Sequence, residues 1–248
     1  LADAFGMANG KGINELGSGY DKDHPYVGRD PRFYMTFAYD GSTFTVNDKT
    51  QTIETFEGGK DATATNKTAT KTGYYLKKLL SPQAVWDGRT NNITRTWILM
   101  RYAEVLLNYA EAACGAGEMG VAVEQLKKIR ARVGYTSANN FGLQTNLSGD
   151  QAACFAAILY ERQIELAYEG KRFDDLRRWM LFDGGAERAE GAPDTWVPSG
   201  WNGNTCTYLG FKQLNGQRRD NLEFRVSSTH ESKGLGGTSW EINGVNPD

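Results

Sequence analysis

The sequence predicts a mainly α-helical fold with long irregular loops and a few short strands. Apolar side chains recur at helical spacing in several segments of residues 97–182. Outside that region the chain is rich in glycine, asparagine and threonine, and its 29 glycines far outnumber its 6 prolines, which indicates long polar connections. At 248 residues the chain can form one or two domains with a buried core.

We divide the chain, as a single region, into three parts. Residues 1–96 form a loop- and strand-rich part, residues 97–182 a helical core, and residues 183–248 a loop-rich tail. In the first part, aromatic or alternating runs bounded by turn residues predict strands. These strands are expected at Phe33–Tyr39, Phe44–Val46, Gln51–Phe56 and Gly73–Lys78. The stretch 57–72 is rich in Thr, Ala and Lys, and we expect it to be a solvated loop.

The central helix is expected from Trp97 to about Cys114. Its apolar residues recur with the spacing of one helix face, at Ile98, Leu99, Tyr102, Val105, Leu106, Tyr109 and Ala113. Arg101, Glu104 and Glu111 argue against a membrane span, because a charge at the centre of such a span costs about 2.5 kcal/mol or more. Alanines would let a second helix approach closely. We therefore expect a buried packing helix.

Further helices are expected after the break at Gly115–Gly117. The second runs from about Met119 to Val133 and ends before Gly134, so that it forms an αα-hairpin with the first. The third covers about 149–169, with capping-box spacing at Ser148 and Gln151 and a stop at Gly170. The last elements are a short helix at Phe173–Phe182 and two tail strands at Tyr208–Leu214 and Leu222–Val226.

Composition excludes several classes of function. The net charge of −2 gives no basic field for nucleic acid, so we expect no nucleic-acid partner. Only two histidines occur, in separate loops, and no zinc-ligand spacing or nucleotide-binding motif is present, so we expect no metal and no cofactor. Asp21 and Asp23 leave a calcium site open, although no EF-hand loop follows them.

The three cysteines are Cys114, Cys154 and Cys206. An odd number cannot form a complete disulfide framework, and the first two lie in alanine-rich helical stretches where a thiol behaves as a small hydrophobe. A single Cys114–Cys154 bridge stays open. The cysteines therefore do not indicate whether the protein lies in an oxidising or a reducing compartment.

The carboxylates of the third helix are the strongest argument for an enzyme. Glu161, Glu165 and Glu169 share one face, as a general acid/base cluster would. Arginines follow closely in the sequence, however, and charges of both signs on a buried helix usually form structural ion pairs. We expect such pairs here. Asp174 and Asp175 are expected to stabilise a helix N-terminus through its dipole.

Several aromatic residues lie in polar loop sequence, where they are either anchors tucked into the core or parts of a binding surface. Sugars present flat C–H faces that exposed aromatic rings can stack on, while neighbouring polar side chains bind the hydroxyls. The residues in question are Tyr20, Tyr26, Trp86, Trp196 and Trp201.

Five motifs, in the right order over roughly residues 30–180, resemble those of the SusD/RagB-like outer-membrane lipoproteins. The segment Arg101–Ala112, RYAEVLLNYAEA, resembles the RxAEvLLxxAEA signature of that family. The others are Asp30–Arg32 with Tyr39–Gly41, Thr72–Lys78, Ile129–Gly134, and Ile158–Arg162 continuing through Glu165–Trp179. The end of the chain, Phe211–Asp248, departs from the family pattern and retains only Asn246–Pro247 of its tail motif.

The resemblance implies a SusD-like fold, with tetratricopeptide-like helical pairs and a loop-rich binding region. It further implies that the chain is the C-terminal half of a longer protein, whose missing N-terminal half carries the lipidated cysteine and packs against the central helix. The expected location is the cell surface, on the outer membrane.

The implied function is non-enzymatic capture of an oligosaccharide or polysaccharide nutrient for a SusC-like, TonB-dependent transporter. Family glycan contacts come from loops, which map onto Tyr20, His24 and Tyr26 here, and we add Trp86, Trp196 and Trp201 as candidates. Peptide binding, as in RagB-like relatives, is an alternative. A carbohydrate-active enzyme and a purely structural helical scaffold are two others.

Overall fold

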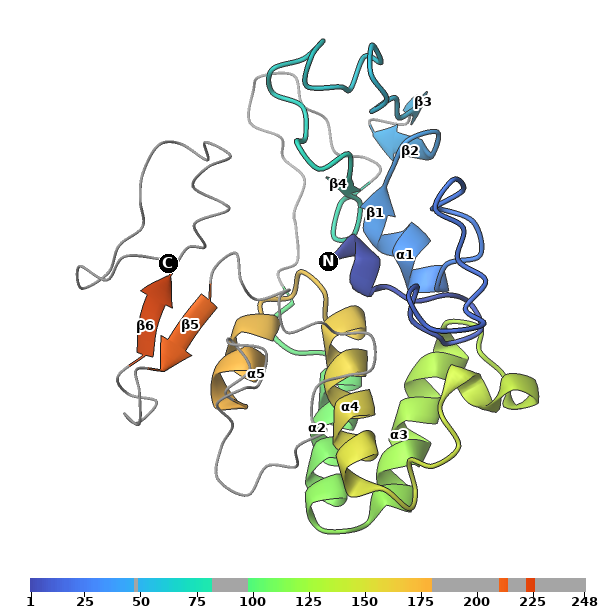
Figure 1. Ribbon diagram of the computed structural model, residues 1–248, viewed down its shortest axis with the longest axis vertical. Helices are drawn as coiled ribbons and strands as arrows, with labels where there is room; N and C mark the ends of the chain where they lie inside the picture. The colour runs from blue at the N-terminus through green and yellow to red at the C-terminus, as the bar shows by residue number, and fades with distance from the viewer. Residues whose placement is uncertain (47–48, 82–97, 180–209, 214–221, 226–248) are drawn as a thin grey trace. The chain divides into compact units, whose positions relative to one another are not determined.

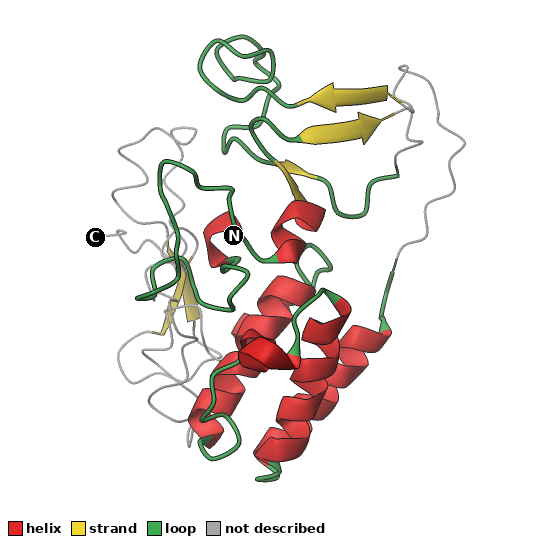
Figure 2. Ribbon diagram, turned by 90° about the vertical axis from the view of Figure 1, so that its right-hand side faces the viewer, coloured by secondary structure: helices red, strands yellow, loops and turns green. Residues whose placement is uncertain are grey.

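The computed structural model describes residues 1–46, 49–81, 98–179, 210–213 and 222–225, the last two ranges as backbone pairing (Figure 1). The chain divides into two compact units. The first comprises Leu1–Arg101 with Val133–Tyr135, and the second comprises Tyr102–Arg132 with Thr136–Asp248. The described helices are longer and more numerous than the described strands (Figure 2), which confirms the predicted mainly α class.

The first unit contains two short helices and four short strands. They are the 3₁₀ helix η1 (Ala2–Ala4), α1 (Pro31–Thr36), β1 (Phe37–Ala38), β2 (Thr43–Val46), β3 (Lys49–Thr52) and β4 (Tyr75–Leu76). Antiparallel pairing joins β1 to β4, with Phe37 opposite Leu76, and β2 to β3, with Thr43 opposite Thr52. The predicted strand Phe44–Val46 is confirmed. The strand expected at Gln51–Phe56 is shifted toward the N-terminus, since β3 covers Lys49–Thr52, and the one expected at Gly73–Lys78 is limited to Tyr75–Leu76.

The strand predicted at Phe33–Tyr39 is wrong over most of its length, because α1 begins at Pro31. The side chain of Asp30 accepts a hydrogen bond from the backbone N–H of Arg32 at 2.8 Å, which caps the helix. Proline at the first helical position adds a preset φ and lacks the N–H that would otherwise be unsatisfied. Only Phe37 and Ala38 adopt the expected strand conformation.

The second unit is built on three long helices that pack against one another. Its elements are α2 (Tyr102–Gly115), α3 (Met119–Arg132), the 3₁₀ helix η2 (Ser137–Gly142), α4 (Gln151–Glu165), α5 (Arg172–Arg178), β5 (Gly210–Gln213) and β6 (Leu222–Arg225). Figure 1 shows α2 and α4 lying side by side, with α3 against them. Their shared core includes Leu107, Leu126, Ile158 and Leu159, all fully buried. The β5–β6 hairpin confirms the two predicted tail strands.

The central helix α2 differs from its prediction at its start and in its buried face. It begins at Tyr102, and the preceding Leu99 is 76% exposed. Tyr102 and Tyr109, expected to point inward, are 72% and 52% exposed, whereas Leu107 and Ala110 are fully buried. The apolar spacing extends around much of this helix, so periodicity alone selected the wrong face. The predicted burial of these side chains against a missing half stays a prediction.

The remaining helices follow the sequence more closely. Helix α3 matches its predicted range within a residue, and Gly134, with φ of 104°, follows its end as expected. The predicted capping box at Ser148 is wrong: Asp150 is the N-cap of α4 and accepts from the N–H of Ala153 at 3.0 Å. Among the described residues, no helix has the length and apolar character needed to cross a membrane.

Two buried cysteines lie in the helical core of the second unit. Cys114 and Cys154 are free thiols, so the disulfide left open by the sequence is not formed. The Sγ of Cys114 lies 3.6 Å from the carbonyl oxygen of Gln151, which also places α2 against the start of α4. Cys206 lies outside the described residues.

Candidate functional site

The three loop residues predicted to contact a glycan all lie in the first unit. His24 is exposed, and its Nδ1 lies 2.8 Å from the carboxylate of Asp21, which lowers the pKa of that carboxyl group. Tyr20 and Tyr26 are partly buried. Arg29 packs against this loop, and its guanidinium carbon lies 5.6 Å from the centre of the Tyr20 ring.

Arg29 is the anchor of this loop. Its side chain is almost fully buried, and its guanidinium donates to the carbonyl oxygens of Pro25 at 2.8 Å and of Ala2 and Phe5 at 2.7 Å each. The same group lies 4.4 Å from the centre of the Phe33 ring, which adds a cation–π contact. Burial of the charge is therefore offset by carbonyl dipoles and an aromatic face.

Tyr26 belongs to an aromatic cluster centred on Phe33. Its ring centre lies 4.4 Å from that of Tyr39 and 6.2 Å from that of Tyr74. Burial, reinforced by the neighbouring Tyr26, raises the pKa of Tyr74 to about 12, and burial also raises the pKa of Tyr26 and Tyr39. Because its ring packs against others, Tyr26 acts as a loop anchor; its role as a glycan contact stays a prediction.

The remaining three predicted glycan contacts are tryptophans. Trp86, Trp196 and Trp201 lie outside the described residues. The structure thus places Tyr20, His24 and Tyr26 in one loop, with Arg29 against the ring of Tyr20 and Phe33 against the ring of Tyr26.

The first unit also contains a pocket that sequence reasoning missed. Its volume is about 890 Å³, and we call it the α1–β2 pocket. Three separate segments line it: Pro31, Tyr34 and Met35 of α1; Thr43, Phe44 and Thr45 of β2; and Lys77, Lys78, Leu79 and Leu80. The pairing of β1 with β4, which leads directly into Lys77, brings the last of these segments next to α1.

Hydrogen bonds fix the walls of the α1–β2 pocket. The backbone N–H groups of Lys77 and Lys78 both donate to the carbonyl oxygen of Thr36, at 2.8 and 3.2 Å. The Nζ of Lys77 donates to the carbonyl oxygen of Tyr34 at 3.2 Å. The hydroxyl of Tyr34 in turn donates to the carbonyl oxygen of Tyr26 at 2.6 Å, which links this pocket to the predicted loop.

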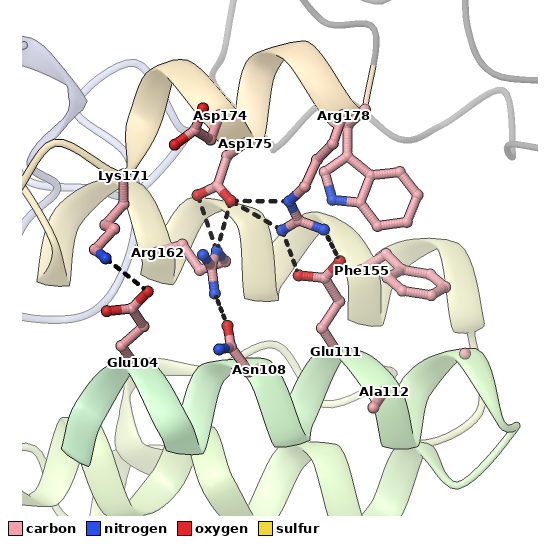
Figure 3. Close-up of a pocket in the computed structure, with 12 residues that line it drawn as sticks. Glu104, Asn108, Glu111, Ala112, Phe155, Arg162, Lys171, Asp174, Asp175 and Arg178 are labelled. Carbon is pink, nitrogen blue, oxygen red and sulfur yellow. Dashed lines mark hydrogen bonds and ion pairs between the residues drawn. The ribbon is translucent and has the colours of Figure 1, made fainter. Parts of the chain in front are cut away.

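A second pocket, of about 560 Å³, lies among α2, α4 and α5 in the second unit (Figure 3). Its charged side chains bind one another. Arg162 donates to Asp175 at 2.8 Å and to Asn108 at 2.7 Å, while Arg178 bridges Asp175 and Glu111. Asp175 was expected to stabilise the N-terminus of a helix through the helix dipole. Its main contacts are instead buried ion pairs with Arg162 and Arg178.

Two of the three glutamates considered as acid/base candidates are engaged in ion pairs, and the third, Glu169, lies after the end of α4 and not on its face. Glu161 is fully buried and lies 2.8 Å from the Nε of Arg130, and Glu165 lies 2.6 Å from Arg132. The structural ion pairs predicted for this helix are thus present. No group of three or more His, Cys, Asp or Glu side chains suited to a metal ion occurs within the described residues.

Comparisons with known proteins identify the family. The model of the SusD family matches residues 1–212. A curated relative, the SusD-like protein P2 of Formosa agariphila, is 40% identical over 89 residues, which are 34% of this chain and 17% of that protein. The chain therefore spans a small part of the length of this relative.

Solved structures agree with this result. A SusD-like protein of Bacteroides fragilis, BF3747, superposes with a TM-score of 0.58 at 29% identity, over 73% of this chain and 35% of that one. A SusD-like carbohydrate binding protein of the same organism, BF0978, gives 0.51 at 23% identity, over 73% and 34% of the two chains, and supports the fold alone. The predicted SusD-like, tetratricopeptide-like helical fold is thereby confirmed, and the chain belongs to the SusD family.

Proposed function

We propose that the chain is part of a cell-surface protein that binds a glycan and presents it to a TonB-dependent transporter in the outer membrane. The observation that carries this proposal is the SusD family match over residues 1–212. The family resemblance in the sequence implies a surface lipoprotein, a SusC-like transporter as partner and a nutrient glycan as ligand. The N-terminal part of such a protein would carry the lipid.

The proposed glycan contacts lie in the first unit and in the tail. Tyr20 and His24 offer a ring and an imidazole from a loop that Arg29 holds in place. The α1–β2 pocket adds aromatic and hydroxyl groups beside that loop, which suits a sugar because sugars combine apolar faces with many hydroxyls. Trp86, Trp196 and Trp201 remain proposed contacts on the basis of sequence.

The ion pairs formed by the carboxylates of helix α4 support binding without catalysis. A general acid or base must be within reach of the bond that it acts on, with a pKa suited to proton transfer. Glu161 and Glu165 are instead buried and engaged by Arg130 and Arg132. These contacts suit a structural role on helix α4.

Isothermal titration of the chain against a panel of polysaccharides tests the proposal. We expect a Tyr20→Ala variant to bind the responding glycan roughly three- to tenfold more weakly, because one aromatic contact contributes about 0.5–1.5 kcal/mol. Tyr109→Ala, at an exposed tyrosine of the second unit, is the matched control and should leave affinity unchanged.

Other outcomes of the same titration identify the alternatives. Binding of oligopeptides, without binding of any glycan in the panel, would indicate that the protein is a peptide-binding member of the family. Release of products from a glycan, abolished by Glu161→Gln in a folded variant, would instead establish an enzyme.

A further inference from the structure

We infer that Cys114 and Cys154 are a redox-active pair, which a small-molecule disulfide oxidises to an intramolecular disulfide between α2 and α4. The structure gives the reduced form of this pair, in which both thiols are free. The inference goes beyond the proposed function, because it concerns the covalent state of the helical core and is independent of the ligand.

The end of α2 and the start of α4 lie against each other at the two cysteines. The Sγ of Cys114 lies 3.6 Å from the carbonyl oxygen of Gln151, and the side-chain amide of Gln151 donates to the carbonyl oxygen of Cys114 at 2.7 Å. In an α-helix the carbonyl oxygen of a residue points toward the turn that follows it. The Sγ of Cys114 is therefore beside the turn of α4 that contains Cys154, and both side chains belong to the same buried core.

The two thiols are also hydrogen-bonded to each other, and this contact makes them chemically different. It raises the pKa of Cys114 and lowers the pKa of Cys154, where it outweighs the opposing effect of burial. The thiolate is the form of cysteine that attacks a disulfide, so Cys154 is the attacking sulfur. Cys114, in contact with it, is placed to attack next and complete the crosslink.

The oxidation balances with a small disulfide, such as oxidised glutathione, as the oxidant. The thiolate of Cys154 attacks one sulfur of the oxidant, whose S–S bond breaks and releases one thiolate. Cys114 then loses its proton and attacks the Sγ of Cys154, which forms the intramolecular disulfide and releases the second thiolate. In total, two electrons and two protons pass from the protein to the oxidant, which ends as two thiols.

The position of the pair at two helix ends gives the oxidant a route to it. Cys114 is the second-last residue of α2, and Cys154 is in the first turn of α4. Helix ends open locally at a smaller free-energy cost than helix centres. Because both side chains are fully buried, the oxidant reaches them only when these ends open. Oxidation should therefore be slow in the folded chain and faster in mild denaturant.

Incubation of the purified chain with mixtures of oxidised and reduced glutathione tests the inference. Remaining thiols are alkylated in denaturant and counted by mass spectrometry, and peptide mapping identifies any linked pair. We expect the oxidised chain to lose two of its three thiols and to yield a peptide that links Cys114 to Cys154. The crosslink closes a loop that contains α3, so it should raise the unfolding midpoint by about 5–10 °C, reversibly with dithiothreitol.

Single cysteine variants then assign the two roles. Cys114→Ala leaves the attacking sulfur without its partner, so it should accumulate a mixed disulfide with glutathione at Cys154. Cys154→Ala should form several-fold less mixed disulfide, because the remaining thiol has a raised pKa. Cys206→Ser is the matched control, and it should keep both the crosslink and the rise in the unfolding midpoint. The linked peptide from the unaltered chain does not depend on the folding of any variant.

The outcomes separate this inference from the proposed function. Three alkylatable thiols after prolonged oxidation, in buffer and in mild denaturant, would overturn the redox pair, as would a linked peptide that contains Cys206. Either result would leave glycan capture standing. Failure to bind any glycan in the titration would contradict the proposed function and would not affect the crosslink.

Discussion

The most deeply buried arginine of the first unit and those of the second unit have different partners. In the first unit, Arg29 donates to three backbone carbonyl oxygens and lies over the ring of Phe33. In the second, Arg130 and Arg162 pair with the buried carboxylates of Glu161 and Asp175. Dipoles and rings therefore hold Arg29, whereas Arg130 and Arg162 are held by opposite charge, as is Arg32 of the first unit by Asp30.

This difference shows where ligand chemistry is available. In the second unit, the pairing of arginines with carboxylates is part of the packing of α2, α4 and α5, and the charges are used to hold these helices together. In the first unit, the aromatic cluster and the lysines of the α1–β2 pocket are held by backbone hydrogen bonds. The first unit thus offers aromatic surface to the proposed ligand.

The largest expected effect is at the buried ion pair of the second unit. Glu161→Gln should destabilise that unit by about 3–5 kcal/mol, because it leaves Arg130 buried without its carboxylate. Urea unfolding followed by circular dichroism, which reports mainly on the helices, measures this change.

The exposed pair on the same helix as Arg130 is the matched control. Glu124 is 60% exposed in its pair with Lys127, so Lys127→Ala should change stability by less than about 1 kcal/mol. Equal effects of the two substitutions would show that the buried pair carries no special role in this unit.

The next effect in size is expected at the centre of the aromatic cluster in the first unit. Phe33 is fully buried, and its ring lies 5.4 Å from both Phe37 and Tyr39. Phe33→Leu should cost about 2 kcal/mol through lost ring contacts and imperfect packing. Hydrogen exchange of the β1 and β4 amides should report this loss. The effect should not depend on salt; a marked salt dependence would contradict the comparison.

The fold of the second unit was the more predictable of the two. Helix α3 has an apolar stripe at helical spacing and ends at a glycine with positive φ, and its prediction is confirmed within a residue. For α2 the apolar residues lie on more than one face, so the sequence could not tell that Tyr109 is exposed while Glu104 is buried. In the first unit, aromatic content at Phe33 predicted a strand although the Asp30–Pro31 pair carried the signal of a helix start.

The candidate site was predictable only in part. Loop composition pointed to Tyr20 and Tyr26, and the family resemblance added His24; all three lie in one loop of the first unit. The α1–β2 pocket was missed because its lining comes from segments around residues 34, 44 and 77, and the two-residue strand pairing that joins them has no periodic signal. Charged motif residues such as Arg162 were correctly predicted to form ion pairs, because both signs alternate along the sequence.

A smaller effect is expected where a single hydroxyl joins two parts of the first unit. The hydroxyl of Tyr135 donates to the carboxylate of Asp30 at 2.9 Å and lies 3.2 Å from the carbonyl oxygen of Met7. Tyr135→Phe should cost about 1–2 kcal/mol, since it removes a buried hydrogen bond to a charged acceptor. Tyr109→Phe, at an exposed tyrosine, should be neutral within about 0.5 kcal/mol in the same thermal unfolding assay.

The same substitution has a consequence at low pH. Burial disfavours the charge of Asp30, but Arg32 outweighs this effect and lowers the pKa of the carboxyl group. A lowered pKa in the folded state gives stability that is present above the unfolded value near 4 and is lost as the pH falls. Because Tyr135 also hydrogen-bonds this carboxylate, Tyr135→Phe should reduce the pH dependence in acid; an unchanged dependence would show that Arg32 alone sets it.

The smallest effect is expected at high pH, at the aromatic cluster of the first unit. The pKa of Tyr74 is raised to about 12, first by burial and then by Tyr26. The folded state therefore keeps a proton that the unfolded chain releases near pH 10, and the stability of the first unit should fall as the pH rises from about 10 to 12. The near-ultraviolet absorbance of tyrosinate should show a late titration step that Tyr74→Phe removes. A single step near pH 10 for all tyrosines would contradict the burial of this cluster, and with it the rigid aromatic support that distinguishes the first unit from the second.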